Sequence, residues 1–290
     1  MRCGSHRRTS VSSRSPWRVF TRSTYADGRW RRADEWHHRP AVTTLYPSAV
    51  HPRGIRDWDR EADLQAIRDT YDRYDDTGRA HLWDERAAGY ARLTREVQAS
   101  LVHSLELSIP SVGGRVLDLG CGDGSLAGEA LLPRTGIEWI GVDLRPEAIA
   151  RARELFPELS FIIASGDAVP LEAASVDVVV ARLLFSSLPS ADLEAAVAAE
   201  IHRLIRPGGW LVWLDLRYPN PTNPAVHGLS MARLASLFPG WKRELRAAGL
   251  LPPVARRLGR ATGVVYPVLA AVPLLRSHLV GRLQHPALVE

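Results

Sequence analysis

The sequence contains a single lysine, Lys242, so nearly all of its basic side chains are arginine. It also contains only two cysteines, Cys3 and Cys121. Two cysteines cannot build a disulfide framework or a cysteine-based zinc site, and no other metal site is predicted. Scarcity of cysteine is typical of proteins from a reducing compartment, and we expect a cytoplasmic protein.

Long apolar runs are also missing. The longest uncharged stretch near the C terminus, 261–275, is shorter than the ~20 residues of a membrane-spanning helix and is interrupted by prolines. We therefore expect no transmembrane segment. The stretch is interpreted as packed against the sheet. The alternative is peripheral contact with a membrane face or with a lipid substrate, since Arg256, Arg257 and Arg276 lie beside it.

Charge is unevenly distributed along the 290 residues. Residues 1–55 carry 11 arginines against 3 acidic residues, residues 56–202 carry 14 arginines against 26 acidic residues, and residues 203–290 are basic again. We interpret residues 1–55, rich in Arg and Ser without apolar periodicity, as a disordered or mis-annotated basic extension; a transit peptide has a similar bias. The acidic central segment argues against nucleic acid as the partner.

Ordered structure is expected from residue 56. Helical spacing over 57–76 and 82–108, separated by Thr77-Gly78, predicts an N-terminal helical cap over residues 56–110. The aromatic residues of this cap are either core residues or a lid over a ligand: Tyr71, Tyr74, Trp83 and Tyr90.

From Gly114 onward, apolar strands alternate with helices. We predict strands at 115–119, 139–142, 161–164, 176–181, 210–214, 264–269 and 277–283. We predict helices at 126–132, 145–155, 191–205, 231–238 and 241–248. This alternation predicts an α/β domain over residues 111–290, with a mostly parallel sheet, helices on both faces and a ligand at the carboxyl ends of the strands.

The stretch Val116-Leu117-Asp118-Leu119-Gly120-Cys121-Gly122-Asp123-Gly124-Ser125 predicts a strand, a glycine loop and a helix that together hold a nucleotide-like ligand. A P-loop is excluded because the one lysine lies elsewhere. A dinucleotide fingerprint would need glycine where Ser125 stands. Asp118 suits a cationic ligand group, and Asp143, 23 positions after Gly120, suits ribose hydroxyls. S-adenosylmethionine has both features.

A series of motifs between Gly114 and Asp215 resembles class I S-adenosylmethionine-dependent methyltransferases of the bacterial type 11-like group. The motifs are the glycine-loop stretch, Gly141-Val142-Asp143-Leu144, Gly166-Asp167-Ala168 with Pro170-Leu171, Asp177-Val178-Val179-Val180-Ala181-Arg182, and Arg206-Pro207-Gly208-Gly209. The resemblance implies a Rossmann-like seven-stranded mostly parallel sheet and S-adenosylmethionine as the cofactor.

The resemblance also implies the residues that contact the cofactor. They are Asp118, Gly120, Cys121, Gly122, Gly124, Asp143, Leu144, Gly166, Asp167, Ala168, Arg182 and Leu183. In this family Asp143 would bind the ribose and Asp167 would meet the adenine amino group. Cys121 is interpreted as a small loop residue rather than a nucleophile. Arg182 is either part of the pocket wall or a member of a surface ion pair.

The polar, proline-rich stretch 215–224 follows the predicted strand 210–214 and ought to face the methyl acceptor. Asp215, Tyr218 and His227 are the candidate catalytic residues, with Arg217 as a further candidate for acceptor binding. The alternative is a proline-stiffened loop whose side chains only satisfy backbone groups. His278 is interpreted as structural.

These features predict a methyltransferase that acts on a small-molecule, glycan or lipid-linked acceptor. The region from Asp215 to Leu283 resembles a bacterial subgroup linked to cell-surface glycans or lipid-linked metabolites. The alternative is a catalytically inactive S-adenosylmethionine-binding regulatory module of the same fold, and a dehydrogenase is more distant. No nucleic-acid partner is expected.

Overall fold

The computed structural model of the chain describes residues 24–26, 29–31, 58–76, 87–110, 113–130, 136–220, 223 and 225–287. The chain divides into two units, 1–45 and 46–290. In the first unit, β1 (Thr24–Ala26) pairs antiparallel with β2 (Arg29–Arg31). The rest of the proposed extension over residues 1–55, the helix break at 77–78, Trp83 and the predicted helix end at 131–132 lie outside the described residues.

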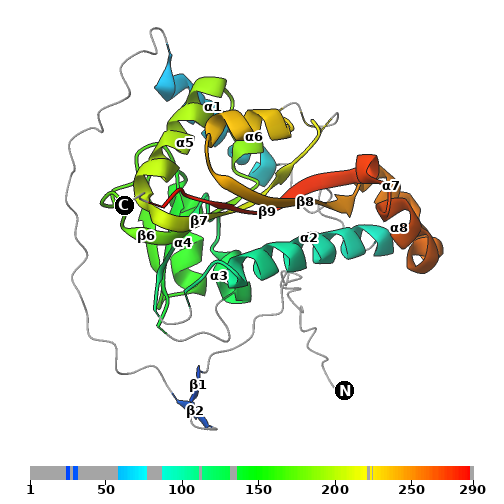
Figure 1. Cartoon of the computed structure of the whole chain (residues 1–290), viewed down its shortest axis with the longest axis horizontal. Helices are drawn as coiled ribbons and strands as arrows, with labels where there is room; N and C mark the ends of the chain where they lie inside the picture. The colour runs from blue at the N-terminus through cyan, green and yellow to red at the C-terminus, as the bar shows by residue number, and fades with distance from the viewer. Residues whose placement is uncertain are drawn as a thin grey trace, which may run out of the picture. The chain divides into compact units, whose positions relative to one another are not determined.

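The second unit contains a seven-stranded sheet (Figure 1). Its strands are β3 (Arg115–Leu119), β4 (Glu138–Asp143), β5 (Ser160–Ile163), β6 (Val176–Arg182), β7 (Ile205–Leu216), β8 (Lys242–Leu250) and β9 (Arg276–Gln284). They follow the order β5-β4-β3-β6-β7-β9-β8, in which β9 runs antiparallel to both of its neighbours. The other described pairings in this sheet are parallel. The predicted seven-stranded, mostly parallel sheet is therefore confirmed.

Helices cover both faces of this sheet. They are α1 (Arg60–Asp76), α2 (Ala88–Glu106), α3 (Ser125–Ala130), α4 (Pro146–Leu155), α5 (Ala191–Leu204), α6 (Met231–Leu237), α7 (Pro252–Arg257) and α8 (Thr262–Ala270). One apolar cluster joins α1, α5 and α6 to one face, and another joins α2, α3, α7 and α8 to the opposite face. Strand β7 shows why: Leu211 and Trp213 enter the first cluster, whereas Val212 and Leu214 enter the second, because successive strand residues point to opposite faces.

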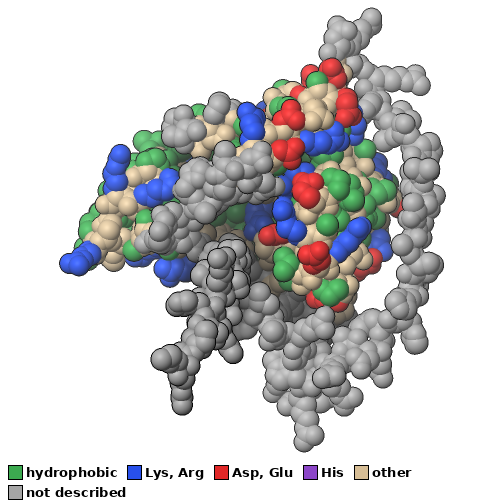
Figure 2. All heavy atoms as spheres, turned by 180° about the vertical axis from the view of Figure 1, so that it is seen from behind, with side chains coloured by type: hydrophobic (Ala, Val, Ile, Leu, Met, Phe, Trp, Pro, Cys, Tyr) green, Lys and Arg blue, Asp and Glu red, His purple; other side chains and the backbone are tan. Residues whose placement is uncertain are grey.

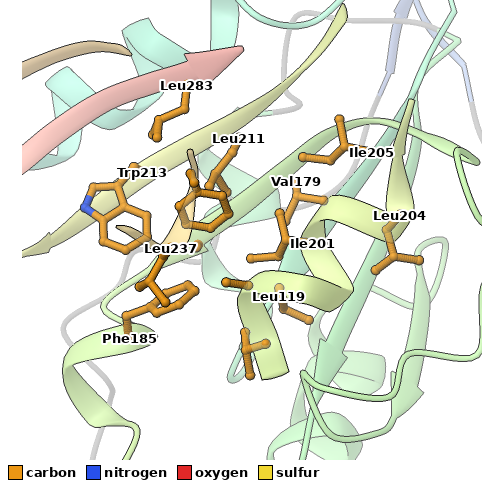
Figure 3. Close-up of a cluster of buried hydrophobic side chains, with 14 of the residues drawn as sticks. Leu119, Val179, Phe185, Ile201, Leu204, Ile205, Leu211, Trp213, Leu237 and Leu283 are labelled. Atoms are coloured by element: carbon orange, nitrogen blue, oxygen red, sulfur yellow. The ribbon is translucent and has the colours of Figure 1, made fainter. Parts of the chain in front are cut away.

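The first cluster is anchored by aromatic side chains (Figure 3). Trp213 is fully buried, and its ring centroid lies 4.9 Å from that of Phe185. Phe238, after α6, packs against both rings. Phe185 begins the short 3-10 helix η2 (Phe185–Ser187), so this packing fixes η2 just beyond the carboxyl end of β6. That end of the sheet is where a parallel α/β fold binds its ligand.

The helix predicted over 241–248 is wrong, because Lys242–Leu250 forms the edge strand β8. Its leucine, alanine, arginine and glutamate residues favour a helix when read locally. The antiparallel strand β9 overrides that preference by offering its free edge, and β8 pairs with β9 along nearly its whole length. Gly281 of β9 allows this pairing, since a Cβ there would lie 2.1 Å from the carbonyl oxygen of Glu244.

The strand predicted over 264–269 is also wrong, because the segment lies in helix α8. Its valines favour a strand when read locally. The buried residues Thr262, Tyr266 and Ala270 are spaced four apart and so lie on one face of a helix. The Tyr266 hydroxyl donates to Oε2 of Glu96 in α2, at 2.7 Å, which fixes that face inward. No described helix is long and apolar enough to cross a membrane.

Candidate active site

The glycine loop after β3 is held by the end of β4. Gly120, Gly122 and Gly124 have φ angles of +76°, +58° and +75°, which side chains with a Cβ rarely adopt. The Gly122 N–H donates to Oδ2 of Asp143 at 2.9 Å. The N–H groups of Gly120 and Cys121 both donate to the carbonyl oxygen of Val142. Asp143 therefore shapes the loop as well as facing the space beside it.

Cys121 belongs to the packing of this loop. Its side chain is buried with Phe161, whose ring fits against Gly141: a Cβ at Gly141 would lie 2.5 Å from that ring. Burial raises the pKa of the Cys121 thiol far above its usual range, and the negative charges of Asp118 and Asp143 add to this. A thiol in this state stays protonated, which matches its interpretation as a small loop residue.

Asp118 is a buried carboxylate with an unpaired oxygen. The residue is 1% exposed, and its Oδ2 atom has no hydrogen-bond partner among the described residues. Burial raises the pKa of Asp118 to about 7; the positive charge of Arg182 opposes this rise, and Asp143 adds to it. A buried polar atom without a partner is costly. The arrangement fits a ligand that brings a cationic hydrogen-bond donor to this carboxylate.

Two further aspartates follow the neighbouring strands. Asp143 ends β4 and also accepts from the backbone N–H of Arg145 at 3.0 Å. Asp167 lies after β5, where Nη2 of Arg60 donates to its Oδ1 atom at 2.9 Å and the Ser165 hydroxyl donates as well. Burial opposes ionisation of Asp167, but the hydrogen bonds from Arg60 and Ser165 outweigh it and lower its pKa. Asp167 is therefore ionised and already paired in this structure.

A pocket opens between these strand ends and helix α1. Its enclosed volume is about 80 Å³, and the hollow continues into open solvent. The predicted cofactor residues that line it are Gly120, Asp143, Leu144, Gly166, Arg182 and Leu183. The others belong to the same strands and loops without lining the pocket: Asp118, Cys121, Gly122, Gly124, Asp167 and Ala168.

Helix α1 forms the wall of the pocket that the sequence motifs did not identify. Leu64, Ile67 and Tyr71 of α1 line it. The guanidinium of Arg145 lies 4.1 Å from the centre of the Tyr71 ring. Of the aromatic residues predicted as either core or lid, Tyr71 therefore lies at the pocket, whereas Tyr90 is buried in the core on the opposite face of the sheet.

Polar contacts fix α1 over the pocket. Arg60 pairs with Asp167, and the Ser190 hydroxyl at the start of α5 donates to Asp63. Near the end of α1, the Tyr74 hydroxyl is hydrogen-bonded to the side chain of Asn223. Helix α2, the other helix of the predicted cap, packs against β8, β9 and α7.

A second hollow adjoins the pocket and shares Ile67, Ser187 and Leu188 with it. Its other lining residues are Ala66, Thr70, Pro189, Ser190, Ala191, Glu194, Ala225 and His227. The imidazole Nε2 of His227 lies 2.8 Å from Oε1 of Glu194, and Nε of Arg233 donates to Oε2 of Glu194 at 2.7 Å. This hollow therefore places a histidine–carboxylate pair beside the pocket.

The pair is electrostatically coupled. Its hydrogen bond to Glu194 raises the pKa of His227, although burial opposes the rise. Burial disfavours the Glu194 carboxylate, but hydrogen bonds from His227 and Arg233 outweigh it and lower the pKa of Glu194. Glu194 gives no functional signal in the sequence, because an acidic residue in the first turn of a helix is explained equally well by the helix dipole.

The structure does not bring the three predicted catalytic residues together in one hollow. Asp215 is buried and accepts from the backbone N–H groups of Ser186, at 3.1 Å, and Leu216, at 2.8 Å. Burial raises its pKa to about 6, against the effect of these hydrogen bonds. The backbone N–H of His227 donates to the carbonyl oxygen of Ser186. Asp215 and His227 are therefore both hydrogen-bonded to the backbone of Ser186.

Tyr218 lies outside both hollows. Its hydroxyl donates to the carbonyl oxygen of Leu274 at 3.1 Å, and Arg217 donates to the carbonyl oxygens of Pro273 and Arg276. These contacts tie the loop after β7 to the segment before β9. His278 is buried beside Ser277, and burial lowers its pKa to about 4, so it is neutral at physiological pH.

The order of the strands, the glycine loop and the aspartates at three strand ends define a nucleotide-binding α/β domain. Residues 116–209 match the family described as "Methyltransferase domain". The chain thus contains a class I S-adenosylmethionine-dependent methyltransferase domain. S-adenosylmethionine is accordingly the cofactor of this domain.

Named relatives agree with this assignment. The phthiotriol/phenolphthiotriol dimycocerosates methyltransferase of Mycobacterium leprae is 28% identical over 51% of this chain and 53% of its own length. The malonyl-[acyl-carrier protein] O-methyltransferase of Enterobacter lignolyticus is 32% identical over 45% of this chain and 51% of its own length. The chain thus spans about half the length of the curated relatives it matches.

A solved structure agrees in fold. A chain from the complex between the Haloferax volcanii Trm112 methyltransferase activator and a candidate methyltransferase superposes with a TM-score of 0.51. The match covers 74% of this chain and 97% of that chain, at 22% sequence identity. At this identity the likeness concerns the fold alone.

Proposed function

We infer that the chain transfers a methyl group from S-adenosylmethionine to an oxygen of an acceptor bound in the second hollow. The observation that carries this proposal is the unpaired, buried Asp118 carboxylate at the end of β3. An ammonium group on the ligand would give it the partner that it lacks. Because the histidine–carboxylate pair of His227 and Glu194 borders the second hollow, which adjoins the pocket, the geometry supports catalysis more than binding alone.

The chain's own residues suit each part of the cofactor. Asp118 would hold the amino-acid arm, the carboxylate of Asp143 would accept from the ribose hydroxyls, and Asp167 would accept from the adenine amino group. When bound, the cofactor supplies a methyl group on a positively charged sulfur. Leu64, Ile67 and Tyr71 of α1 would exclude water from this space.

His227 is our candidate proton acceptor. Its Nε2 atom is engaged by Glu194, and no residue in the described part of the chain is hydrogen-bonded to its Nδ1 atom. Glu194 would orient the ring and stabilise its positive charge after the proton is taken up. The hollow also has apolar walls at Ile67 and Leu188. These features favour a small-molecule, lipid-linked or glycan-linked acceptor that presents a hydroxyl or acidic oxygen beside an apolar body.

Incubation of the full chain with methyl-tritiated S-adenosylmethionine and fractionated bacterial lipid and small-molecule extracts tests this function. We expect label to enter an extractable acceptor and to stay there through mild treatments that hydrolyse the cofactor. A chain that binds the cofactor but labels no fraction would instead be the inactive regulatory module. The relatives named above, one of which is an O-methyltransferase, make lipid extracts the first fractions to try.

Replacing Arg60 by alanine is expected to tighten cofactor binding. In this structure the guanidinium of Arg60 holds the carboxylate that would meet the adenine amino group, so the two compete. A partly exposed ion pair contributes about 1 kcal/mol or less, and its removal should lower the dissociation constant about threefold to fivefold. Titration calorimetry measures this. Arg68→Ala, on the exposed side of the same helix, is the matched control. Weaker binding in Arg60→Ala would mean that Arg60 closes α1 over the cofactor.

A further inference from the structure

The segment between β8 and β9 forms a projecting surface that the site does not use. It contains α7, the 3-10 helix η3 (Gly259–Ala261), α8 and the 3-10 helix η4 (Pro273–Leu275), and we call residues 252–275 the C-terminal wing. Figure 1 shows α7 and α8 beyond the end of the sheet, beside the first turns of α2. The wing packs closely against α2 at Gly89. The carbonyl oxygen of Ala255 lies so close to Gly89 that a Cβ at this position would be 2.1 Å from that oxygen.

The outer face of the wing is apolar. Tyr266 points inward to Glu96, so the residues two positions away on α8 point outward. Val264 is 78% exposed and Val268 is 66% exposed, and Leu274 of η4 is 74% exposed. Val272 between them is 43% exposed. These are among the most exposed large apolar side chains of the described residues, and they gather within eleven consecutive positions.

The wing is also strongly basic. The sequence from residue 245 to residue 289 contains no aspartate or glutamate. Arg257 and Arg260 are exposed and form no ion pair with any residue that the structure describes, while Arg256 lies over the ring of Tyr90. In Figure 2 the part of the surface on the side of α7 and α8 shows arginine and apolar side chains together, without the acidic side chains seen elsewhere.

We propose that the C-terminal wing docks the protein on an anionic lipid surface. Apolar side chains would enter the interface between lipid headgroups and acyl chains, and the arginines would meet the phosphate charges, as in other basic apolar surface elements. A second copy of the chain fits less well, because a symmetric contact through this face would bring the unpaired Arg257 and Arg260 of one copy toward those of the other. This proposal goes beyond methyl transfer and does not depend on it.

The C-terminal wing would also hold the loop after β7 near the lipid surface. Tyr218 and Arg217 of the loop after β7 are hydrogen-bonded to Leu274, Pro273 and Arg276. The same loop continues to His227 at the second hollow. A lipid surface bound by the wing is therefore mechanically connected to the segment that borders the proposed acceptor site.

Sedimentation of the full chain with vesicles tests the proposal. We expect binding to vesicles that contain phosphatidylglycerol and little binding to vesicles of phosphatidylcholine alone. Each arginine near an anionic surface contributes about fivefold to partitioning. The double variant Arg257→Gln/Arg260→Gln should therefore bind about 30-fold less tightly. The matched control, Lys242→Gln/Arg243→Gln, removes the same charge from the far end of β8 and should bind like the unaltered chain.

Variants of the exposed apolar side chains distinguish insertion of these side chains into the lipid from electrostatic attraction by the arginines. Val264→Ser/Val268→Ser/Leu274→Ser should lose about tenfold or more of the binding that remains at high salt, because each exposed side chain would otherwise leave water. Unchanged melting temperature and cofactor binding would show that these variants fold. Equal losses in the wing and control arginine variants would overturn the proposal and assign lipid binding to net charge or to residues 1–55. Self-association of the unaltered chain that the apolar variants abolish, without vesicle binding, would overturn it in favour of a second copy.

Discussion

Replacing Asp118 by asparagine is expected to weaken S-adenosylmethionine binding about 100-fold while making the unliganded protein more stable above pH 7. Both effects have one cause, the buried carboxylate without a partner. Removing one member of a buried charge pair costs roughly 2–5 kcal/mol, and about 2.7 kcal/mol corresponds to 100-fold in affinity. Asparagine keeps the size of the side chain and removes only the charge. Titration calorimetry measures the affinity, and thermal unfolding measures the stability.

The pH dependence of the stability of Asp118→Asn distinguishes the loss of a buried charge from a nonspecific loss of stability. The pKa of Asp118 in the folded chain is raised to about 7, above the ordinary value of a carboxyl group. The folded chain therefore loses stability as the pH rises from the ordinary carboxyl pKa of 3.8 to about 7, and the loss is complete above about pH 7. The stabilising effect of Asp118→Asn should be absent below about pH 4, grow between pH 4 and pH 7, and stay constant from pH 7 to pH 8. Asp123→Asn, in the same loop, is the matched control. A variant that is less stable than the unaltered chain at pH 8 would contradict this account.

The ionisation of Asp118 should also make the affinity of the unaltered chain for S-adenosylmethionine depend on pH. A cationic ligand group binds the ionised form, so binding should weaken as the pH falls below 7 and should release a proton from Asp118. Calorimetry in buffers with different ionisation enthalpies detects this proton. Affinity that stays constant from pH 8 to pH 6 would show that Asp118 does not bind the ammonium group.

Replacing His227 by alanine is expected to lower kcat for methyl transfer about 100-fold to 10,000-fold, the range typical of a lost general base, with cofactor affinity unchanged. The imidazole borders the second hollow, and Glu194 holds its Nε2 atom. Loss of the ring would remove the proton acceptor while leaving the cofactor pocket intact. Single-turnover kinetics with the labelled acceptor measure the effect. His103→Ala, on the exposed surface of α2, is the control.

A second variant identifies the role of Glu194. Glu194→Gln would remove the negative charge that raises the pKa of His227. The pH profile of kcat should then shift its lower limb toward acidic pH, because a neutral partner no longer favours the protonated ring. A merely structural Glu194 would lower activity without moving the profile. Full activity in His227→Ala would show that His227 is not the base in the second hollow and would refute this part of the proposal.

The parts of the site that the sequence could predict are local in the chain. The glycine loop, Asp118 and Asp143 belong to strand ends whose apolar residues and turns are readable over a few positions. Their proposed chemistry was inferred from residue type, since a carboxylate before the loop would suit a cationic ligand group. These residues appear in the structure at the carboxyl ends of β3 and β4, as a parallel sheet requires.

The parts that the sequence could not predict depend on distant contacts. The Glu194–His227 pair joins α5 to a loop 33 positions away, and Arg60 meets Asp167 across 107 positions. The two errors in the C-terminal half have the same origin. Strand β8 exists because β9 offers an edge, and α8 exists because α2 receives Tyr266. Local propensity favoured the opposite structure in both segments, and tertiary packing decided them.

Calorimetric titration of the full chain with S-adenosylmethionine at pH 8 tests directly whether the site binds this cofactor. We expect one binding site, competition by S-adenosylhomocysteine and no binding of NADH. The acceptor is not needed for this measurement. A folded chain that gives no binding with S-adenosylmethionine, or that binds NADH instead, would contradict the account.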